Sequence, residues 1–99
     1  MTPHNELRLL PWSGPDGKPC YLSTGDSGGY MSRLAANIEA IQLGTATDLL
    51  ERAARVLGDQ DAGRDDLRLM LTEVTRALRD VVRVATSRGH LLAVRELQS

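Results

Sequence analysis

Residues 67–85, LRLMLTEVTRALRDVVRVA, decide the fold. Their apolar residues recur at alternating steps of four and three, which is typical of an α-helix that packs one face against other helices. Asp65 and Asp66 precede the run, where the positive end of the helix dipole favours acidic side chains, and Gly89 follows it as a helix-ending residue. We therefore expect a helix over residues 64–88. The expected contact seam consists of Leu67, Leu71, Val74, Leu78, Val81 and Ala85, and it is widened by Met70, Ala77 and Val82.

A second helical pattern precedes it, over residues 27–57, and carries two apolar rows instead of one. A helix in a simple two-helix hairpin has one partner and needs one apolar stripe, so two rows indicate two partners. The first row is Tyr30, Leu34, Ile38, Ile41, Thr45, Leu49 and Val56, and the second is Ala36, Leu43, Leu50 and Leu57.

The stretch GDQDAG, residues 58–63, separates the two helical patterns. Gly58 suits a helix C-cap in the left-handed conformation. Because the connection is short, we expect the two helices to form an antiparallel hairpin.

Two helices cannot enclose a core alone, and the row Leu43, Leu50 and Leu57 would stay in water in a monomer. A contiguous apolar row of this length is unusual on a monomeric protein. We therefore expect a homodimer in which four helices share one core, with these three leucines at the interface. The expected fold is mainly α: one domain over residues 1–99, dimerising into a four-helix bundle.

The N-terminal segment, residues 5–24, contains two strand-like runs around the turn sequence SGPDGKP. It is interpreted either as a short β-hairpin or as an irregular extended arm, resting on the helices because a lone hairpin is marginal in water. Trp12 and Tyr21 flank the turn and are placed to face each other across a hairpin. They either pin the segment to the helices or, with Lys18, form an exposed recognition surface. The tail, residues 90–99, is either a short helix or a docked arm.

The string GDSGG, residues 25–29, matches the surroundings of the nucleophile in trypsin-like serine proteases. That chemistry needs a histidine and an aspartate placed by a β-barrel before the serine, and only His4 precedes Ser27. We therefore reject a protease and interpret Asp26 or Ser27 as the helix N-cap. An anion or ligand site at this helix start remains a minor alternative.

Arginines gather on the face of the second helix opposite its expected seam. This face is interpreted as a solvated surface with local ion pairs, as a site for an acidic protein, or as a phosphate-backbone site. Cys20, His4 and His90 share no metal-ligand spacing, so we expect neither metal nor cofactor. We call the arginines proposed as an interaction surface the arginine face; they are Arg68, Arg76, Arg79 and Arg83.

Composition narrows the function classes. The chain has 12 basic and 13 acidic residues, which gives no bulk attraction to nucleic acid or anionic membrane. One cysteine excludes an internal disulfide, and the N-terminus lacks the pattern of a signal peptide. No apolar run approaches a membrane span. We expect a cytoplasmic protein.

The run LPWSGPDGKPCYLSTGDSGGYMSRLAANIEAIQLG, residues 10–44, resembles a group of small actinomycete proteins. These share an LPW…GKPCYL…LSRLA pattern, followed by an arginine-rich helix near ALRDVVRVA. Ala36 stands where the group pattern has an acidic residue. The group is similar in setting to small accessory proteins of transcriptional regulators, so the resemblance implies a transcriptional regulator as a candidate partner. It supplies no activity, cofactor or site.

The sequence therefore predicts a non-enzymatic protein-interaction or regulatory accessory module. One alternative is a DNA-binding accessory protein that uses the arginine face, although the balanced charge makes nucleic acid the weaker expectation. Another is a small-molecule binder at the junction of hairpin and helix, around Trp12, Cys20 and Ser27.

Overall fold

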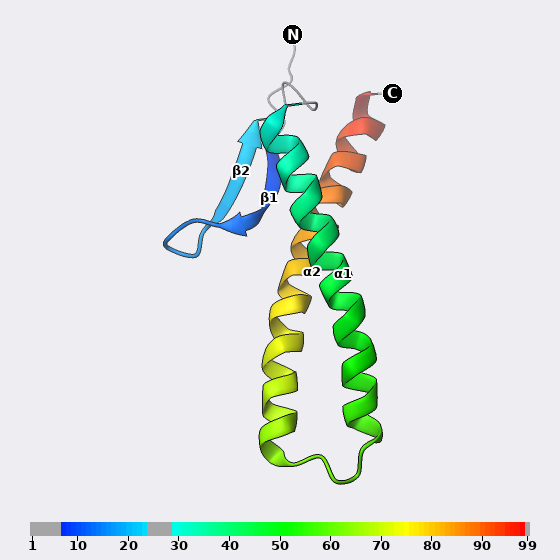
Figure 1. Ribbon diagram of the computed structural model, residues 1–99. Helices are drawn as coiled ribbons and strands as arrows, with labels where there is room; N and C mark the ends of the chain where they lie inside the picture. Colours follow the sequence, from blue (N-terminus) through cyan, green and yellow to red (C-terminus); the bar gives the residue numbers. More distant parts are fainter. Residues whose placement is uncertain (1–6, 24–28, 99) are drawn as a thin grey trace.

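The structure is a computed structural model that describes residues 7–23 and 29–98, with side chains described as far as Gly89. Figure 1 shows two long antiparallel helices with a two-stranded antiparallel sheet beside one end of the pair. The mainly helical chain with an N-terminal β-hairpin is therefore confirmed. The elements in chain order are β1 (Leu7–Ser13), β2 (Pro19–Ser23), α1 (Tyr30–Gly58) and α2 (Arg64–Gln98).

The hairpin turn is closed by backbone hydrogen bonds. The Gly14 amide donates to the Lys18 carbonyl at 2.9 Å, and the Gly17 amide donates to the Gly14 carbonyl at 2.9 Å. The Asp16 carboxylate accepts from the Lys18 amide at 3.1 Å. Gly17 has φ of 79°, a conformation that side chains with a Cβ rarely adopt. The stretch SGPDGKP therefore forms a tight turn, as its prolines and glycines predict.

The strand register is irregular near the turn. Leu9 lies opposite Tyr21 and Ser13 lies opposite Pro19, so the register shifts between these two pairs. Tyr21 therefore has Leu9 as its cross-strand partner, and the expected pairing of Trp12 with Tyr21 is wrong. The shift is typical of a β-bulge, which re-aims side chains near the end of a strand.

Helix α1 begins later than expected, at Tyr30. Its N-cap is Gly29, which has no side chain to accept from the first amides, so the expected cap at Asp26 or Ser27 is wrong. Both of these residues lie outside the described residues.

The other helix ends also differ from expectation. Gly58 belongs to the right-handed helix, because Gly17 is the one described residue with positive φ. Helix α2 continues to Gln98, so the expected end at Arg88 is wrong, and residues 90–98 extend the same helix. A glycine inside a helix costs only about 1 kcal/mol relative to alanine, and the leucine, alanine and glutamate that follow Gly89 are good helix formers.

The helices pack through smaller residues than the sequence predicts. On α1 the buried apolar residues are Ala35 and Leu49, and on α2 they are Ala77 and Val84. Small side chains let two antiparallel helices approach closely. The larger side chains of the expected α2 seam are turned aside, so that prediction is wrong for its leucines. The exposed fractions are 46% for Leu67, 66% for Leu71 and 59% for Leu78.

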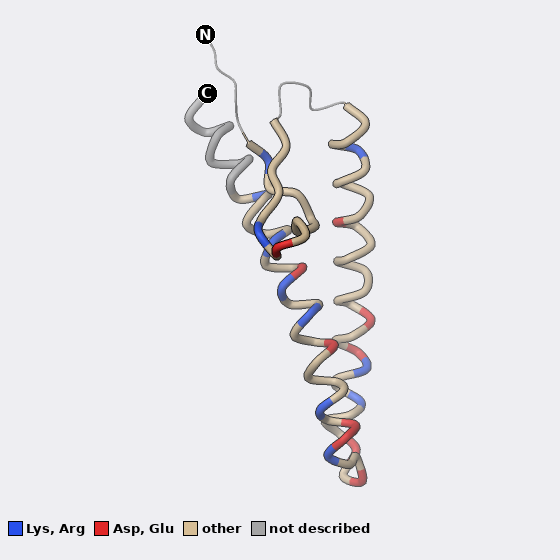
Figure 2. The backbone as a smooth tube through the Cα atoms, turned by 90° about the vertical axis from the view of Figure 1, so that its left-hand side faces the viewer, with Lys and Arg blue, Asp and Glu red and all other residues tan. Residues whose placement is uncertain are grey.

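The β-hairpin packs against both helices where they diverge. Strand β1 contacts both helices, and Figure 1 and Figure 2 together show the hairpin on one side of the pair, across the gap between the helices, at the end away from the α1–α2 connection. Leu10 and Pro11 are buried there. The molecule measures 61 × 31 × 20 Å, and its radius of gyration is 17.3 Å, whereas a compact domain of this length has about 13 Å. The core is therefore thin.

Candidate functional site

A buried ion pair joins the hairpin to α1. Arg8 of β1 directs Nη2 to Glu39 Oε1 at 3.0 Å and Nη1 to the Ser32 carbonyl at 3.3 Å. The Arg8 side chain is 14% exposed and that of Glu39 is 3% exposed. A buried charge without a partner of opposite sign is strongly destabilising. Separating the hairpin from α1 would break this pair, so the pair fixes the hairpin against α1.

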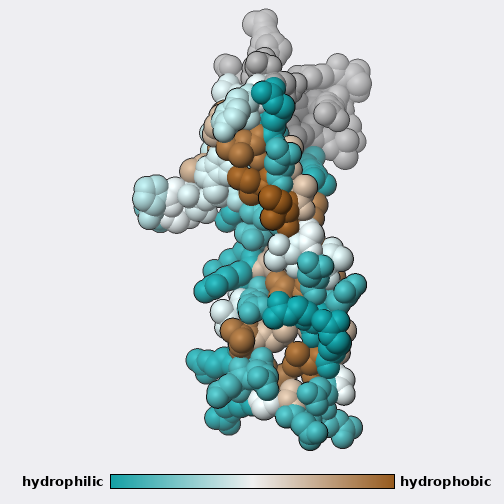
Figure 3. Space-filling view, viewed as in Figure 1, coloured by the Kyte–Doolittle hydropathy of each residue, from teal (hydrophilic) through white to brown (hydrophobic). Residues whose placement is uncertain are grey.

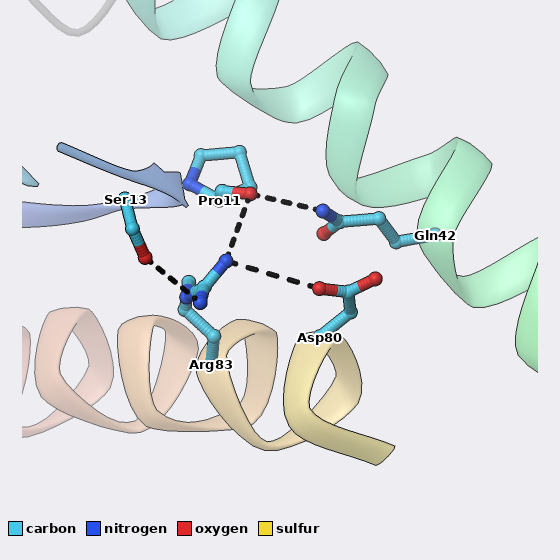
Figure 4. A network of polar contacts seen from close by, with 5 residues as sticks. All are labelled: Pro11, Ser13, Gln42, Asp80 and Arg83. Carbon is cyan, nitrogen blue, oxygen red and sulfur yellow. Dashed lines mark hydrogen bonds and ion pairs between the residues drawn. The ribbon is translucent and has the colours of Figure 1, made fainter. Parts of the chain in front are cut away.

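A second polar cluster joins the hairpin to both helices at once. The Pro11 carbonyl accepts from Gln42 Nε2 at 2.9 Å and from Arg83 Nη1 at 3.1 Å. Arg83 also donates from Nη2 to Ser13 Oγ at 3.2 Å, and its Nη1 lies 3.8 Å from Asp80 Oδ1. Figure 4 shows the Arg83 guanidinium between the end of β1 and Asp80. Arg83 therefore holds the strand in place and does not present a free guanidinium to solvent.

Exposed leucines of both helices lie on the same side of the helix pair. Leu50 follows the buried Leu49 on α1, and Leu78 follows the buried Ala77 on α2. A step of one residue turns about 100° around a helix. The two helices are antiparallel, so the rotation from one residue to the next runs in opposite senses when both are viewed from the same end. The residue that follows a contact residue therefore lies on the same side of the pair in α1 and in α2. Leu57 and Leu71 follow the partly buried Val56 and Met70 in the same way.

We call this surface the leucine face. Leu43 at its end is half-buried, whereas Leu50 is 71% exposed and Leu57 is 82% exposed. The residues expected at a dimer interface thus lie beside the leucines turned away from the α1–α2 contact. The leucine face comprises Leu43, Leu50, Leu57, Leu67, Leu71 and Leu78.

Apolar surface also occurs on other parts of the molecule. Tyr30 and Ile41 of α1 are exposed, and Leu69 of α2 is exposed on the side away from the leucine face. Figure 3 shows apolar atoms at the surface over the N-terminal half of α1. Figure 2 shows that charged residues gather instead in the half of the pair near the α1–α2 connection.

A groove of about 500 Å³ lies between the hairpin and α2. Its apolar lining comes from Leu9 and Pro19 on the hairpin and from Leu78 and Val82 on α2. A second hollow of about 430 Å³ adjoins it along α2. The two hollows share Thr75 and Arg79, and the second also contains Arg68, Leu71, Thr72 and Arg76.

The structure brings the predicted surface residues together only in part. Three arginines of the arginine face line the second hollow, and Arg79 and Arg83 line the groove beside the hairpin turn. Trp12, Lys18 and Tyr21 do not line it. Trp12 is half-buried, Tyr21 is exposed on β2, and Lys18 lies 3.7 Å from Asp16 in an exposed ion pair.

Sequence reasoning missed the residues that attach the hairpin. Arg8 sits in an otherwise apolar strand and Glu39 sits between Ile38 and Ala40, so a charge inside an apolar pattern was the available signal. Gln42 carried no such signal, because a glutamine on a helix is ordinarily a surface residue.

Of the remaining candidates for chemistry, the structure describes the side chain of Cys20 alone. Cys20 is a free, half-buried cysteine, while His4 and Ser27 lie outside the described residues and nothing is described of the His90 side chain. Among the described residues, no three histidine, cysteine or acidic side chains are grouped so as to hold a metal ion. Within the same residues, neither helix combines the length and apolar character needed to cross a membrane.

Comparisons with protein-family models, curated proteins and solved structures find no match for this chain.

Proposed function

We propose that the protein is a non-enzymatic interaction module that forms a homodimer through the leucine face. The observation that carries this proposal is the exposure of Leu50, Leu57 and Leu71 on one side of the helix pair, outside the buried contact between the helices. Large apolar patches of this kind on soluble domains mark contacts with other proteins. A two-fold axis across the leucine face would place four helices around one shared core.

The energetics support association. Complete burial of a leucine side chain stabilises by about 1.5–3 kcal/mol, so the remaining exposed area of each leucine corresponds to about 1–2 kcal/mol. The five exposed members of the leucine face, which are all but the half-buried Leu43, contribute about 10–20 kcal/mol of apolar burial over the two protomers. Loss of translational and rotational freedom opposes this by about 4–15 kcal/mol. The apolar gain is therefore comparable to this opposing term or larger.

We also propose that the module acts as a regulatory accessory protein, with a transcriptional regulator as the class of partner. The resemblance to the actinomycete group supports this role. The engagement of Arg83 with Pro11 and Asp80 removes one cation from the arginine face and weighs against the DNA-binding alternative.

Light scattering coupled to size exclusion tests the dimer at micromolar concentration. Leu50→Glu combined with Leu57→Glu places two charges on the leucine face and leaves α2 unchanged. We expect the wild-type protein to have the mass of a dimer and this variant that of a monomer. The matched control combines Ile41→Glu with Leu69→Glu, two exposed positions on the other side of the helix pair. This control is expected to remain a dimer.

A monomeric wild-type protein would overturn the dimer proposal. So would a control variant that dissociates while the leucine-face variant remains dimeric, because the interface would then lie on the other side. Circular dichroism of each variant establishes that the helices are retained.

A further inference from the structure

The two hollows on α2 adjoin each other and together follow the helix from Arg68 to Thr86. They share the lining residues Thr75 and Arg79, and we call the pair of hollows the trough. At 1.5 Å per residue the trough is about 27 Å long. The hairpin forms one wall of its upper part through Leu9, Ser13 and Pro19. This length matches a helix of about five turns or a shorter extended segment.

The lining of the trough combines apolar groups with one sign of charge. Leu9, Leu78 and Val82 supply the apolar surface of the upper hollow, and Leu71 continues it in the lower one. None of the residues that line either hollow is acidic, although the chain as a whole has more acidic than basic residues. The charged lining residues are Arg68, Arg76, Arg79 and Arg83.

We infer that this trough binds an acidic amphipathic segment of a partner protein. Apolar side chains of the segment pack against Leu78 and Val82, and its carboxylates reach Arg76 and Arg79 along the rim. Charge complementarity carries the choice of occupant, since a basic or neutral segment would leave arginines unpaired and would lose the steering that opposite charges give. The inference rests on the proposed interaction function and names its class of partner.

A nucleic acid fits the trough less well than an acidic peptide. Phosphate-backbone binding is carried by exposed cations and uses no apolar floor. Here, Leu9, Leu78 and Val82 are among the lining residues of the upper hollow, and Arg83 is already engaged with Pro11 and Ser13. An amphipathic segment uses both kinds of lining at once.

Selection from a random library of 16-residue peptides tests the inference with the full-length protein. We expect enrichment of peptides that carry aspartate or glutamate together with large apolar residues at helical spacing. The enriched peptides are then titrated by fluorescence anisotropy against Arg79→Glu combined with Val82→Glu. We expect this variant to weaken binding at least tenfold. Arg64→Glu, which reverses an exposed charge outside both hollows, is expected to change binding less than twofold.

The inference is overturned by three outcomes: no enriched peptides, enriched peptides that are basic or uncharged, or equal binding to wild type and trough variant. Tighter binding of a random DNA duplex than of any peptide, abolished by Arg68→Glu with Arg76→Glu, would assign the surface to nucleic acid instead. Leu71 and Leu78 belong to both the trough and the leucine face, so the segment and a second protomer compete for these two leucines. The peptide is therefore expected to shift the mass of the wild-type protein from dimer toward monomer. The dimer proposal is judged separately, by the mass without peptide. The trough variant retains all six leucines of the leucine face, and its mass without peptide is expected to equal that of wild type.

Discussion

Replacing Glu39 by alanine tests whether the hairpin is attached as the structure shows. Glu39 is 2% exposed and is the carboxylate that pairs with Arg8. Alanine at this position leaves the Arg8 guanidinium, whose side chain is 14% exposed, without its counter-charge. Removing one partner of a buried pair typically costs about 3–5 kcal/mol. Domains of this size have a total unfolding free energy of roughly 5–15 kcal/mol, so the expected loss is a large fraction of it.

Urea unfolding at a fixed protein concentration measures this loss, since dimerisation would otherwise shift the apparent stability. Circular dichroism reports on the helices, and fluorescence of Trp12, the single tryptophan, reports on the hairpin. The matched control is Glu73→Ala, another helical glutamate, which pairs with Arg52 at 3.2 Å. Their side chains are 30% and 49% exposed, so this control is expected to cost no more than about 1 kcal/mol.

A double variant separates the charge from the packing. Arg8 Nε and Glu39 Oε2 are buried without hydrogen-bond partners among the described residues, so the pair is imperfectly satisfied. Arg8→Met with Glu39→Leu removes both charges and is expected to be within about 1 kcal/mol of wild type or more stable. A Glu39→Ala loss no larger than that of Glu73→Ala would refute the docked hairpin.

Four further predictions concern two glycines, the Arg83 contact and the dimer. Gly44→Ala is expected to stabilise the protein by about 0.5–1 kcal/mol, because a Cβ at this position in the middle of α1 meets nothing within 4 Å. Gly17→Ala is expected to destabilise it by about 1 kcal/mol, because Gly17 has a positive φ. Urea unfolding measures both changes in stability. Arg83→Met is expected to cost about 1.5–3 kcal/mol and to speed amide exchange in β1 more than in α1, because Pro11 loses a charged donor. The thermal midpoint is expected to rise with protein concentration, as a dimer requires, and a constant midpoint would contradict the leucine-face proposal.

The parts of the fold that local sequence controls could be predicted. The turn SGPDGKP forces a reversal, because Gly17 supplies the positive φ and the prolines restrict the chain on either side. The apolar spacing in residues 64–88 and the two glycines around the connection likewise place an antiparallel helix pair. These features depend on neighbours in the sequence, which is why they are readable without tertiary information.

The choice of contact face could not be predicted in the same way. Leu71 and Leu78 are large apolar residues at seam spacing on α2 and suggest the seam, but Ala77 and Val84 are the buried apolar residues of this helix. The face that a helix turns to its neighbour depends on how closely the two backbones approach, and that distance is absent from a helical wheel. The same limit applies to the candidate site. The helical spacing of the arginines predicts that they share one face of α2, but it does not predict that Leu9 and Pro19 lie beside them. That placement depends on where the hairpin packs.

The contact between Arg83 and Pro11 joins groups separated by 72 positions in the chain. During synthesis, β1 and its partners on α1, Glu39 and Gln42, are made well before Arg83. The buried leucine and proline of β1 therefore remain uncovered on the α2 side until most of α2 has emerged. Complete seating of the strand is thus a late event in biogenesis, and any nascent chain that stops short of Arg83 holds β1 through α1 alone.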